Sequence, residues 1–375
     1  MIGYSIVMPP EEIIQKESQI KSCSRRHFFK RVATGSIGAG MVLTSASKAP
    51  AQLKLSDQIE EPPPTPVVEA SSAKLWDGEE ADPDVIGEMV DQALIKLTNA
   101  SDIKAAWKGL VLPNDIVAIK VNPLAAFGTP KGQKLSTHPI IVDRIIEGLY
   151  SAGVLAAQVI VWDRFSKHLV DAGYRINKGG KELQCFATDS EGVGYDPKVF
   201  YETKEDIPTR REDGKQLSFY SRILTQLATV IINVPVFKHH GITGVSGCLK
   251  NLAFGSVNNT NRFHSNPLNC DPAISEIFAH TVIKDKLILN IVDGLYASFN
   301  GGPTYDANAI WKQGKILASV DPVILDQIIL DTIDEKRKAE ELEVVRSLAK
   351  YIRSANRAEL GTNDLDKADF QEVTV

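Results

Sequence analysis

The chain alternates between stretches whose apolar residues recur at helical spacing and short runs of β-branched apolar residues. The first pattern predicts helices over 84–97, 138–153, 219–227 and 322–330, and the second predicts buried strands over 116–121, 156–163, 229–237, 287–294 and 315–320. Strands that alternate with helices are typical of a parallel sheet whose two faces are both covered. We therefore expect an α/β fold with a mostly parallel sheet and helices on both faces.

Two segments interrupt this pattern. Residues 177–209 are polar, contain several glycines and show no steady period, so we expect a loop-rich insertion there. Residues 61–72, EPPPTPVVEASS, are rich in proline and poor in apolar side chains, which is typical of an extended tether. We therefore place a linker at 52–75 and the α/β domain at 76–375.

Residues 1–51 contain the parts of a cleavable export signal. The sequence SRRHFFK begins at Ser24, a weakly apolar stretch follows over 32–46, and Ala49-Pro50-Ala51 ends the segment. Paired arginines before a bulky apolar pair indicate a twin-arginine signal, and the apolar stretch is too short for a spanning helix. A basic amphipathic helix is the alternative, but it leaves Ala49-Pro50-Ala51 unexplained. We expect the twin-arginine translocation machinery as a partner and a periplasmic or other extracytoplasmic location.

Charge and cysteine content narrow the class of partner. Without residues 1–51 the chain has 324 residues, with 35 basic against 44 acidic side chains and a net charge of −9. This acidic balance disfavours nucleic acid and anionic lipid as partners. No cysteine directly follows the apolar stretch, so we expect no stable membrane anchor after cleavage. Cys185, Cys248 and Cys270 cannot form a complete disulfide framework, although a single Cys185–Cys270 bridge stays open.

One segment concentrates reactive side chains directly after a predicted strand. Residues 238–264, KHHGITGVSGCLKNLAFGSVNNTNRFH, hold three of the seven histidines and two lysines. Ligands of open parallel sheets bind beyond the carboxyl ends of the strands, where this segment begins. Gly241, Gly244 and Gly247 are evenly spaced, which lets backbone N–H groups approach an anion before a helix expected near Val245. The GxxxxGK[ST] spacing of a nucleotide-binding loop is absent.

Three residues of this segment are the candidates for chemistry. A buried lysine loses charge through desolvation and becomes nucleophilic, and neutral imidazoles ligate metals or move protons near pH 7. We assign His240 and Lys250 as catalytic, Lys250 and the three glycines as cofactor-binding, and His264 with His240 as metal ligands. In the structural alternative Lys250 donates to loop carbonyls, the paired histidines are half exposed and the glycines only make a turn.

The motifs around this segment resemble those of a known family. A strand ending in Asn233-Val234-Pro235 is followed by Lys238, His239 or His240, Thr243-Gly244 and Lys250-Asn251, and DIVAIKVNP, IVDG and Asp321-Pro322-Val323 stand elsewhere in the chain. In these residues the chain resembles the bacterial and archaeal "domain of unknown function 362" over most of the predicted domain. Some relatives add a ferredoxin-like iron–sulfur segment, but this chain has no CxxC, so we expect no iron–sulfur cluster. The family has no assigned activity that this chain would inherit.

The order of the candidate residues is also similar to that in nickel-pincer lactate racemase. The resemblance implies His240 as the acid or base, Ser246-Gly247 as a tight segment, Lys250 as the cofactor-bearing lysine and His264 as the metal ligand. The interval from Lys250 to His264 is shorter than in that pattern, and Cys248 stands in place of its second glycine. What the resemblance implies is a divalent metal or a nickel-pincer-like cofactor.

Other polar residues are weaker candidates. His138 opens a predicted helix after a strand and is a second candidate acid or base. Asp293 closes a strand, where an Asp-Gly pair is typical of a turn, and Asp321 is placed to cap a helix. His168 and His280 fall within helical stretches, so we expect them at the surface or in packing.

Two hypotheses of function follow from these residues. The first is an exported enzyme that uses a metal or a lysine-bound cofactor on a small anionic substrate, with Lys250 at its centre. The second is a non-catalytic anion-binding or assembly protein whose glycine loop holds an anion or a partner segment. Loss of turnover on replacing Lys250 would favour the first, and weakened binding alone would favour the second.

Overall fold

A computed structural model describes residues 63–203, 217–265 and 269–375. Residues Pro66–Val375 form one compact unit, which holds the elements discussed below except for Thr65, the first residue of β1. The predicted export signal at 1–51 lies outside the described residues. Within the described ranges, no helix is long and apolar enough to cross a membrane.

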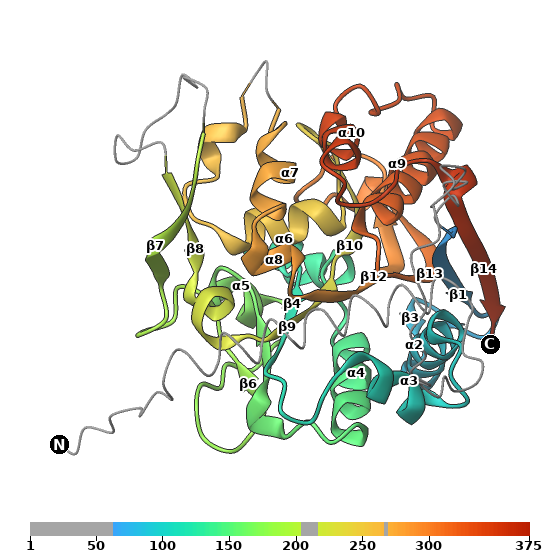
Figure 1. Cartoon of the computed structure of the whole chain (residues 1–375). Coiled ribbons are helices and arrows are strands. Elements are labelled where there is room, and N and C mark those ends of the chain that lie inside the picture. The colour runs from blue at the N-terminus through green and yellow to red at the C-terminus, as the bar shows by residue number, and fades with distance from the viewer. Residues whose placement is uncertain (1–62, 204–216, 266–268) are drawn as a thin grey trace, which may run out of the picture. The chain divides into compact units, whose positions relative to one another are not determined.

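A large sheet runs through the domain, with the strand order β14-β1-β13-β12-β9-β4-β5-β6, and β10 pairs with β12 and with β11 (Figure 1). Its strands are β1 (Thr65–Ser71), β4 (Val117–Val121), β5 (Val159–Trp162), β6 (Gln184–Cys185), β9 (Val230–Val234), β10 (Val236–His240), β11 (Gly244–Ser246), β12 (Leu287–Ser298), β13 (Ile310–Ser319) and β14 (Ala368–Thr374). Two small antiparallel pairs lie apart from it, β2 (Trp76–Asp77) with β3 (Glu80–Ala81) and β7 (Tyr195–Glu202) with β8 (Leu217–Ser221). Strands β12, β9, β4, β5 and β6 are parallel neighbours, which confirms the predicted parallel sheet over this half.

Helices cover both faces of the sheet, as predicted (Figure 1). One face carries α2 (Pro83–Thr98), α3 (Ile103–Leu110) and α4 (Pro139–Ser151), and the other carries α6 (Cys248–Ser256), α7 (Ala273–Phe278), α9 (Pro322–Ala339) and α10 (Lys350–Arg357). Shorter helices are α5 (Ser166–Asp171), α8 (Thr281–Lys284) and the 3-10 turns η1 (Leu124–Ala126), η2 (Pro130–Leu135), η3 (Ala156–Gln158), η5 (Asn261–Phe263), η6 (Ala307–Ala309) and η7 (Leu365–Lys367). The α/β fold is therefore confirmed.

Helix α4 shows why the apolar pattern located the helices well. Ile141, Ile145 and Leu149 stand on one stripe at intervals of four residues and are fully buried. Pro139 occupies the first turn, where its missing N–H removes no helical hydrogen bond. The helix ends before Gly153, whose φ of +97° suits a glycine.

The amino-terminal boundary of the domain differs from the prediction. Strand β1 pairs antiparallel with β13, with Val67 opposite Ser319, and Val67 and Val68 are fully buried. The linker predicted at 52–75 therefore ends about ten residues too late, because prolines mask a short apolar strand. β13 also runs antiparallel to β12, so this half of the sheet departs from the parallel expectation.

The region predicted as a loop-rich insertion contains regular structure within its described part. β7 occupies Tyr195–Glu202 and pairs with β8, and β6 adds a short parallel strand at the sheet edge. β8 replaces the first half of the helix predicted over 219–227, and a π-helical turn, Ile223–Leu227, forms the second half. Alternating exposure along β7 explains why its apolar residues formed no continuous run.

The cysteines of the described residues form no disulfide. Cys185, Cys248 and Cys270 are all free and buried. The bridge between Cys185 and Cys270 that the sequence left open is therefore not formed. All three thiols act as apolar packing groups in the core.

Candidate functional site

A cavity of about 370 Å³ lies beyond the carboxyl ends of β4, β5 and β10. This is the position at which α/β sheets bind ligands. Its lining includes two lysines and an arginine, Lys120, Lys250 and Arg164, and one carboxylate, Asp163. The cavity is lined by Lys120, Asn122, Leu124, Asp163, Arg164, Phe165, His168, His240, Ile242, Ser246, Lys250, Asn251, Phe254, Gly255, Thr260, Asn261, His264 and Pro303. The structure thus brings the three predicted residues His240, Lys250 and His264 together.

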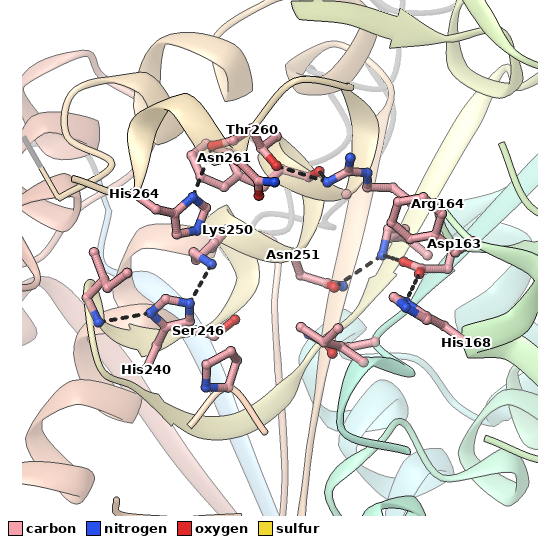
Figure 2. A pocket seen from close by; sticks show the side chains of 18 residues that line it. Asp163, Arg164, His168, His240, Ser246, Lys250, Asn251, Thr260, Asn261 and His264 are labelled. Carbon is pink, nitrogen blue, oxygen red and sulfur yellow. Dashed lines mark hydrogen bonds and ion pairs between the residues drawn. The ribbon is translucent and has the colours of Figure 1, made fainter. Parts of the chain in front are cut away.

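A tight strand–strand–helix unit places His240 beside Lys250. β10 turns back into β11, with His240 opposite Gly244, and α6 starts two residues after β11. Gly244 has a φ of +75°, and an added Cβ would collide with the backbone near Val345. Lys250 lies in the first turn of α6, so its side chain reaches back over the end of β10 (Figure 2).

The hydrogen bonds of His240 define its tautomer. Its Nδ1 accepts from the backbone N–H groups of Ile242 and Thr243, at 3.2 and 3.3 Å. Burial, followed by the charge of Lys250, lowers the pKa of His240 far below its usual value, so the ring is neutral. A neutral imidazole whose Nδ1 accepts must carry its proton on Nε2. The ring therefore presents an N–H donor to whatever faces Nε2.

Lys250 is the group that faces this donor. Its Nζ lies 3.0 Å from His240 Nε2 (Figure 2). An ammonium has no lone pair with which to accept a hydrogen bond, whereas a neutral amine has one. Burial lowers the pKa of Lys250 to about 8, so about a tenth of the amine is neutral at pH 7. The surroundings of Lys250 thus stabilise the nucleophilic form of the amine.

His264 completes this group with the opposite tautomer. Its Nδ1 lies 3.0 Å from the Thr260 carbonyl oxygen, which can only accept, so Nδ1 carries the proton and Nε2 has a free lone pair. Burial lowers the pKa of His264 to about 4. The rings of His264 and His240 lie 5.9 Å apart between centroids, on either side of Lys250 (Figure 2). His264 can therefore accept a proton close to the amine.

A second polar cluster, which the sequence analysis missed, forms the opposite wall. Lys120 Nζ donates to Asp163 Oδ1 and to the Val121 carbonyl, both at 2.6 Å, and to Asn251 Oδ1 at 3.3 Å. Desolvation raises the pKa of Asp163, but the charges and hydrogen bonds of Lys120 and His168 together outweigh it and lower the pKa to about 2. His168 Nδ1 lies 3.7 Å from Asp163 Oδ2. His168 packs against Phe127 and Phe165, as expected, and it also lines the cavity.

Asn251 connects this ion pair to the sheet. Its Nδ2 donates to Asn233 Oδ1 at 2.8 Å, and Asn233 Nδ2 donates in turn to Asn290 Oδ1 at 2.9 Å. Lys120, Asn233 and Asn290 are register neighbours on β4, β9 and β12. This polar row beneath α6 fixes the helix over the strand ends, which gives the Lys-Asn motif a positioning role.

A third buried lysine lies behind the cavity. Lys238 Nζ donates to Asn122 Oδ1 at 2.9 Å, and Asn122 itself lines the cavity. Burial, together with the charge of Lys250, lowers the pKa of Lys238 to about 7. The cavity thus lies in a field of positive charge that favours an anionic ligand.

The glycines of the loop lie beside the cavity lining rather than in it. Gly241, Gly244 and Gly247 are absent from the cavity lining. α6 begins at Cys248 rather than near Val245, and the N–H groups of Cys248 and Leu249 donate to the Asp326 carboxylate of α9. The amino terminus of α6 is therefore already satisfied by the chain's own carboxylate. The three glycines assigned as cofactor-binding therefore lie outside the lining of this cavity.

The donor set does not suit a metal held by His240 and His264 together. Both ring nitrogens of His240 are engaged, one by two backbone N–H groups and the other by Lys250. Among the described residues, no group of three His, Cys, Asp or Glu side chains gathers in a way that could hold a metal ion. Of these two histidines, only His264 has a ring nitrogen without a partner, so the pair does not fit a nickel-pincer arrangement.

The weaker candidates have structural roles. His138 caps α4, because its Nδ1 accepts from the Ile140 N–H at 3.3 Å. The backbone N–H of His138 donates to Asp293 Oδ2 at 2.7 Å. Asp321 caps α9 through Val323 and Ile324, as predicted. His280 caps α8 and packs on Tyr220, which confirms the packing role expected for it. None of these four lines the cavity.

Two sequence signals could have revealed the missed residues. Lys120 is a lysine inside an otherwise apolar strand, and a charged residue at a buried strand position needs a partner. Asp163 and Arg164 directly follow the next parallel strand, where ligand-binding side chains are expected. Their proximity to 238–264 depends on the strand order, which the sequence alone does not give.

The structure is that of an α/β protein with a cavity lined by basic side chains at the carboxyl ends of its parallel strands. Residues 117–331 match the family model described as "Domain of unknown function (DUF362)", which is more than half of the chain. The chain belongs to this family. A comparison with curated proteins found no match.

Among solved structures, the chain is similar to a protein from Thermotoga maritima, a target of the Northeast Structural Genomics Consortium. The two share 12% sequence identity with a TM-score of 0.38, and the similarity covers 75% of this chain. The chain spans 60% of the length of that protein.

Proposed function

We propose that the protein is an enzyme in which the amine of Lys250 attacks a small anionic carbonyl compound. The observation that carries the proposal is the 3.0 Å contact between Lys250 Nζ and a His240 Nε2 that bears a proton. This contact favours the neutral amine, and a neutral buried amine is the form that adds to carbonyl carbon. A lysine in a merely structural role would instead donate to carbonyl or carboxylate oxygens, as Lys120 does.

The charge and size of the cavity support an anionic substrate. Lys120 and Arg164 line it, and Lys238 lies directly behind Asn122, against the single carboxylate Asp163. Asp163 is already neutralised by Lys120, so the remaining charge is positive. A volume of about 370 Å³ suits a small molecule rather than a polymer.

The chemistry requires no group beyond those of the site and the substrate. The lone pair of Lys250 Nζ forms a bond to the carbonyl carbon, and the carbonyl π electrons move to oxygen. His264 Nε2 accepts one proton from the nitrogen and passes it to the oxygen, which becomes a hydroxyl. It then carries the second nitrogen proton to that hydroxyl, which leaves as water when the imine forms. In the resting state the His240 Nε2–H donates a hydrogen bond to the amine lone pair, and this bond breaks as the amine attacks.

Reductive trapping tests this proposal. Sodium borohydride is added to the protein with pyruvate or glyoxylate, and the modified residue is mapped by peptide mass spectrometry. We expect an adduct on Lys250 and none in Lys250→Met. Lys286 is a matched control, because burial also lowers its pKa to about 8 but its Nζ donates to two backbone carbonyls outside the cavity. Absence of an adduct on Lys250, or equal labelling of Lys286, would refute the nucleophilic role.

The pH dependence separates this proposal from a non-catalytic anion-binding protein, which the positive charge of the cavity also supports. Adduct formation needs the neutral amine, so its rate should rise as pH rises through about 8. Anion binding by the ammonium should weaken over the same range. An affinity that falls through pH 8 with no trapping would establish the binding protein instead.

We also propose that the twin-arginine pathway exports the folded protein, on the strength of the sequence of residues 1–51. Replacing Arg25 and Arg26 with lysine should retain the protein in the cytoplasm. Cell fractionation followed by immunoblotting measures this. Unchanged export of the double variant would contradict the proposal.

A further inference from the structure

Three large apolar side chains surround the cavity beside α5 and η1. Leu124 and Phe165 line the cavity and are each 37% exposed, and Phe127 is 51% exposed. The ring of His168, which also lines the cavity, lies 4.8 Å from the Phe127 ring and 4.9 Å from the Phe165 ring, measured between centroids. We call Leu124, Phe127 and Phe165 the apolar rim.

The apolar rim is continuous with a charged interior. A single exposed apolar side chain is ordinary on a protein surface, but Phe127 and Phe165 flank the His168 ring and, with Leu124, leave apolar surface in water beside the cavity. The cavity behind them presents Lys250, Arg164 and His264. A ligand that satisfies both parts carries a negative charge at one end and an apolar group at the other.

The rings of the rim favour an aliphatic group over a flat aromatic one. The Phe165 ring already carries the Arg164 guanidinium at 4.9 Å, and the Phe127 ring carries the Lys167 ammonium at 5.6 Å. His168 packs against both rings as well. With these contacts in place, little ring face remains for stacking, whereas ring edges and the Leu124 methyl groups can still pack on methylene groups.

We propose that the substrate is an amphipathic anion, with its charged carbonyl end at Lys250 and a hydrocarbon chain along the apolar rim. This inference rests on the proposed function for the charged end and adds the chemical class of the remainder. It assigns the rim a role in selecting substrates by chain length. Phe127 is then a specificity residue that contacts the chain and takes no part in bond formation.

Binding of straight-chain carboxylates tests the inference without requiring any reaction at Lys250. Butanoate, hexanoate and octanoate are titrated into the full-length protein by calorimetry, below the concentrations at which they form micelles. Burial of one methylene group strengthens binding by up to about fourfold, so on a half-exposed rim we expect about twofold per methylene. Octanoate should therefore bind on the order of tenfold more tightly than butanoate.

Phe127→Ala is the diagnostic variant, because this exposed side chain can be shortened without opening the core. It should reduce the ratio of octanoate affinity to butanoate affinity by at least about threefold. Phe370→Ala is the control, since Phe370 is 45% exposed on β14, at the other end of the strand order. Circular dichroism checks that both variants remain folded.

The outcomes separate the inference from the proposed function. Equal affinities for all three carboxylates, no binding of any of them, or equal effects of Phe127→Ala and Phe370→Ala would overturn the role of the apolar rim. Trapping at Lys250 would still support the enzyme in those cases. Conversely, chain-length dependence that Phe127→Ala removes, without any trapping at Lys250, would support the rim and reject the nucleophile.

Discussion

Replacing Lys120 with methionine should destabilise the protein strongly, because it leaves the Asp163 carboxylate buried without its counter-ion. Lys120 is almost fully buried, and its three N–H groups all have acceptors, one of them Asp163 Oδ1 at 2.6 Å. Methionine keeps most of the side-chain volume and removes the charge. The variant therefore tests the ion pair with little change in packing.

The size of the expected loss of stability follows from the pKa of Asp163. A pKa of about 2 against 3.8 for an ordinary aspartate corresponds to about 2 kcal/mol in favour of the ionised carboxylate in the folded state. Without Lys120, this gain disappears and the desolvation cost remains. Removing one partner of a buried pair costs about 3–5 kcal/mol in general. We expect a loss of about 4 kcal/mol in the free energy of unfolding at pH 7.

The sign of the pH dependence provides a second test. In the native protein the Asp163 pKa is lowered, so its contribution is present above pH 4 and is lost as pH falls toward 2. In Lys120→Met the folded pKa lies above that of the unfolded chain, so stability is lost as pH rises above 4. The difference in the free energy of unfolding between the native protein and Lys120→Met should therefore be largest at pH 7 and decrease toward pH 4.

Urea unfolding, monitored by tryptophan fluorescence at pH 7 and pH 4.5, measures the loss of stability and its dependence on pH. Lys167→Met is the matched control, because Lys167 pairs with Asp171 at 2.9 Å while its own side chain is 64% exposed. An exposed pair of this kind contributes below about 1 kcal/mol. Two results would refute this account of the ion pair. One is that Lys120→Met loses no more free energy of unfolding than Lys167→Met does, and the other is that its loss does not depend on pH.

Two further predictions concern packing. Gly247→Ala should lower the free energy of unfolding by about 2–4 kcal/mol, because its Cβ would overlap the Asp326 carboxylate that caps α6. Gly87→Ala should raise it by up to about 1 kcal/mol, because its Cβ meets only the Arg144 side chain at 3.6 Å. Thermal unfolding of both variants checks these opposite signs. The three described cysteines are buried, so iodoacetamide at pH 7.5 should leave them unmodified in the native protein and label all three in urea, as peptide mapping would show.

The elements that the sequence predicts well are those whose stability is local. α4 has a regular apolar stripe, and β4 and β9 are continuous β-branched runs, so their pattern alone determines their class. β1 was missed because Pro62, Pro63 and Pro64 directly precede it and its partner β13 lies far away in sequence. A strand that is stabilised by a distant partner leaves a weak local signal.

The candidate site was found in part for the same reason. His240, Lys250 and His264 lie within 25 residues of one another, so their clustering is visible in the sequence. Lys120 and Asp163 join them only because β4 lies between β9 and β5. The tautomers of the histidines depend on backbone N–H and carbonyl groups, which no residue pattern reports.

The position of β1 between β13 and β14 has a consequence for how the protein is made. Val67 pairs with Ser319, so 252 further residues must be synthesised before this strand finds its first partner in the sheet. At cellular rates of about 5–20 residues per second, the ribosome needs roughly 13–50 s to add them. During that interval the nascent chain carries an apolar segment open to mispairing. Chaperones that hold the emerging chain would therefore be most useful at its beginning.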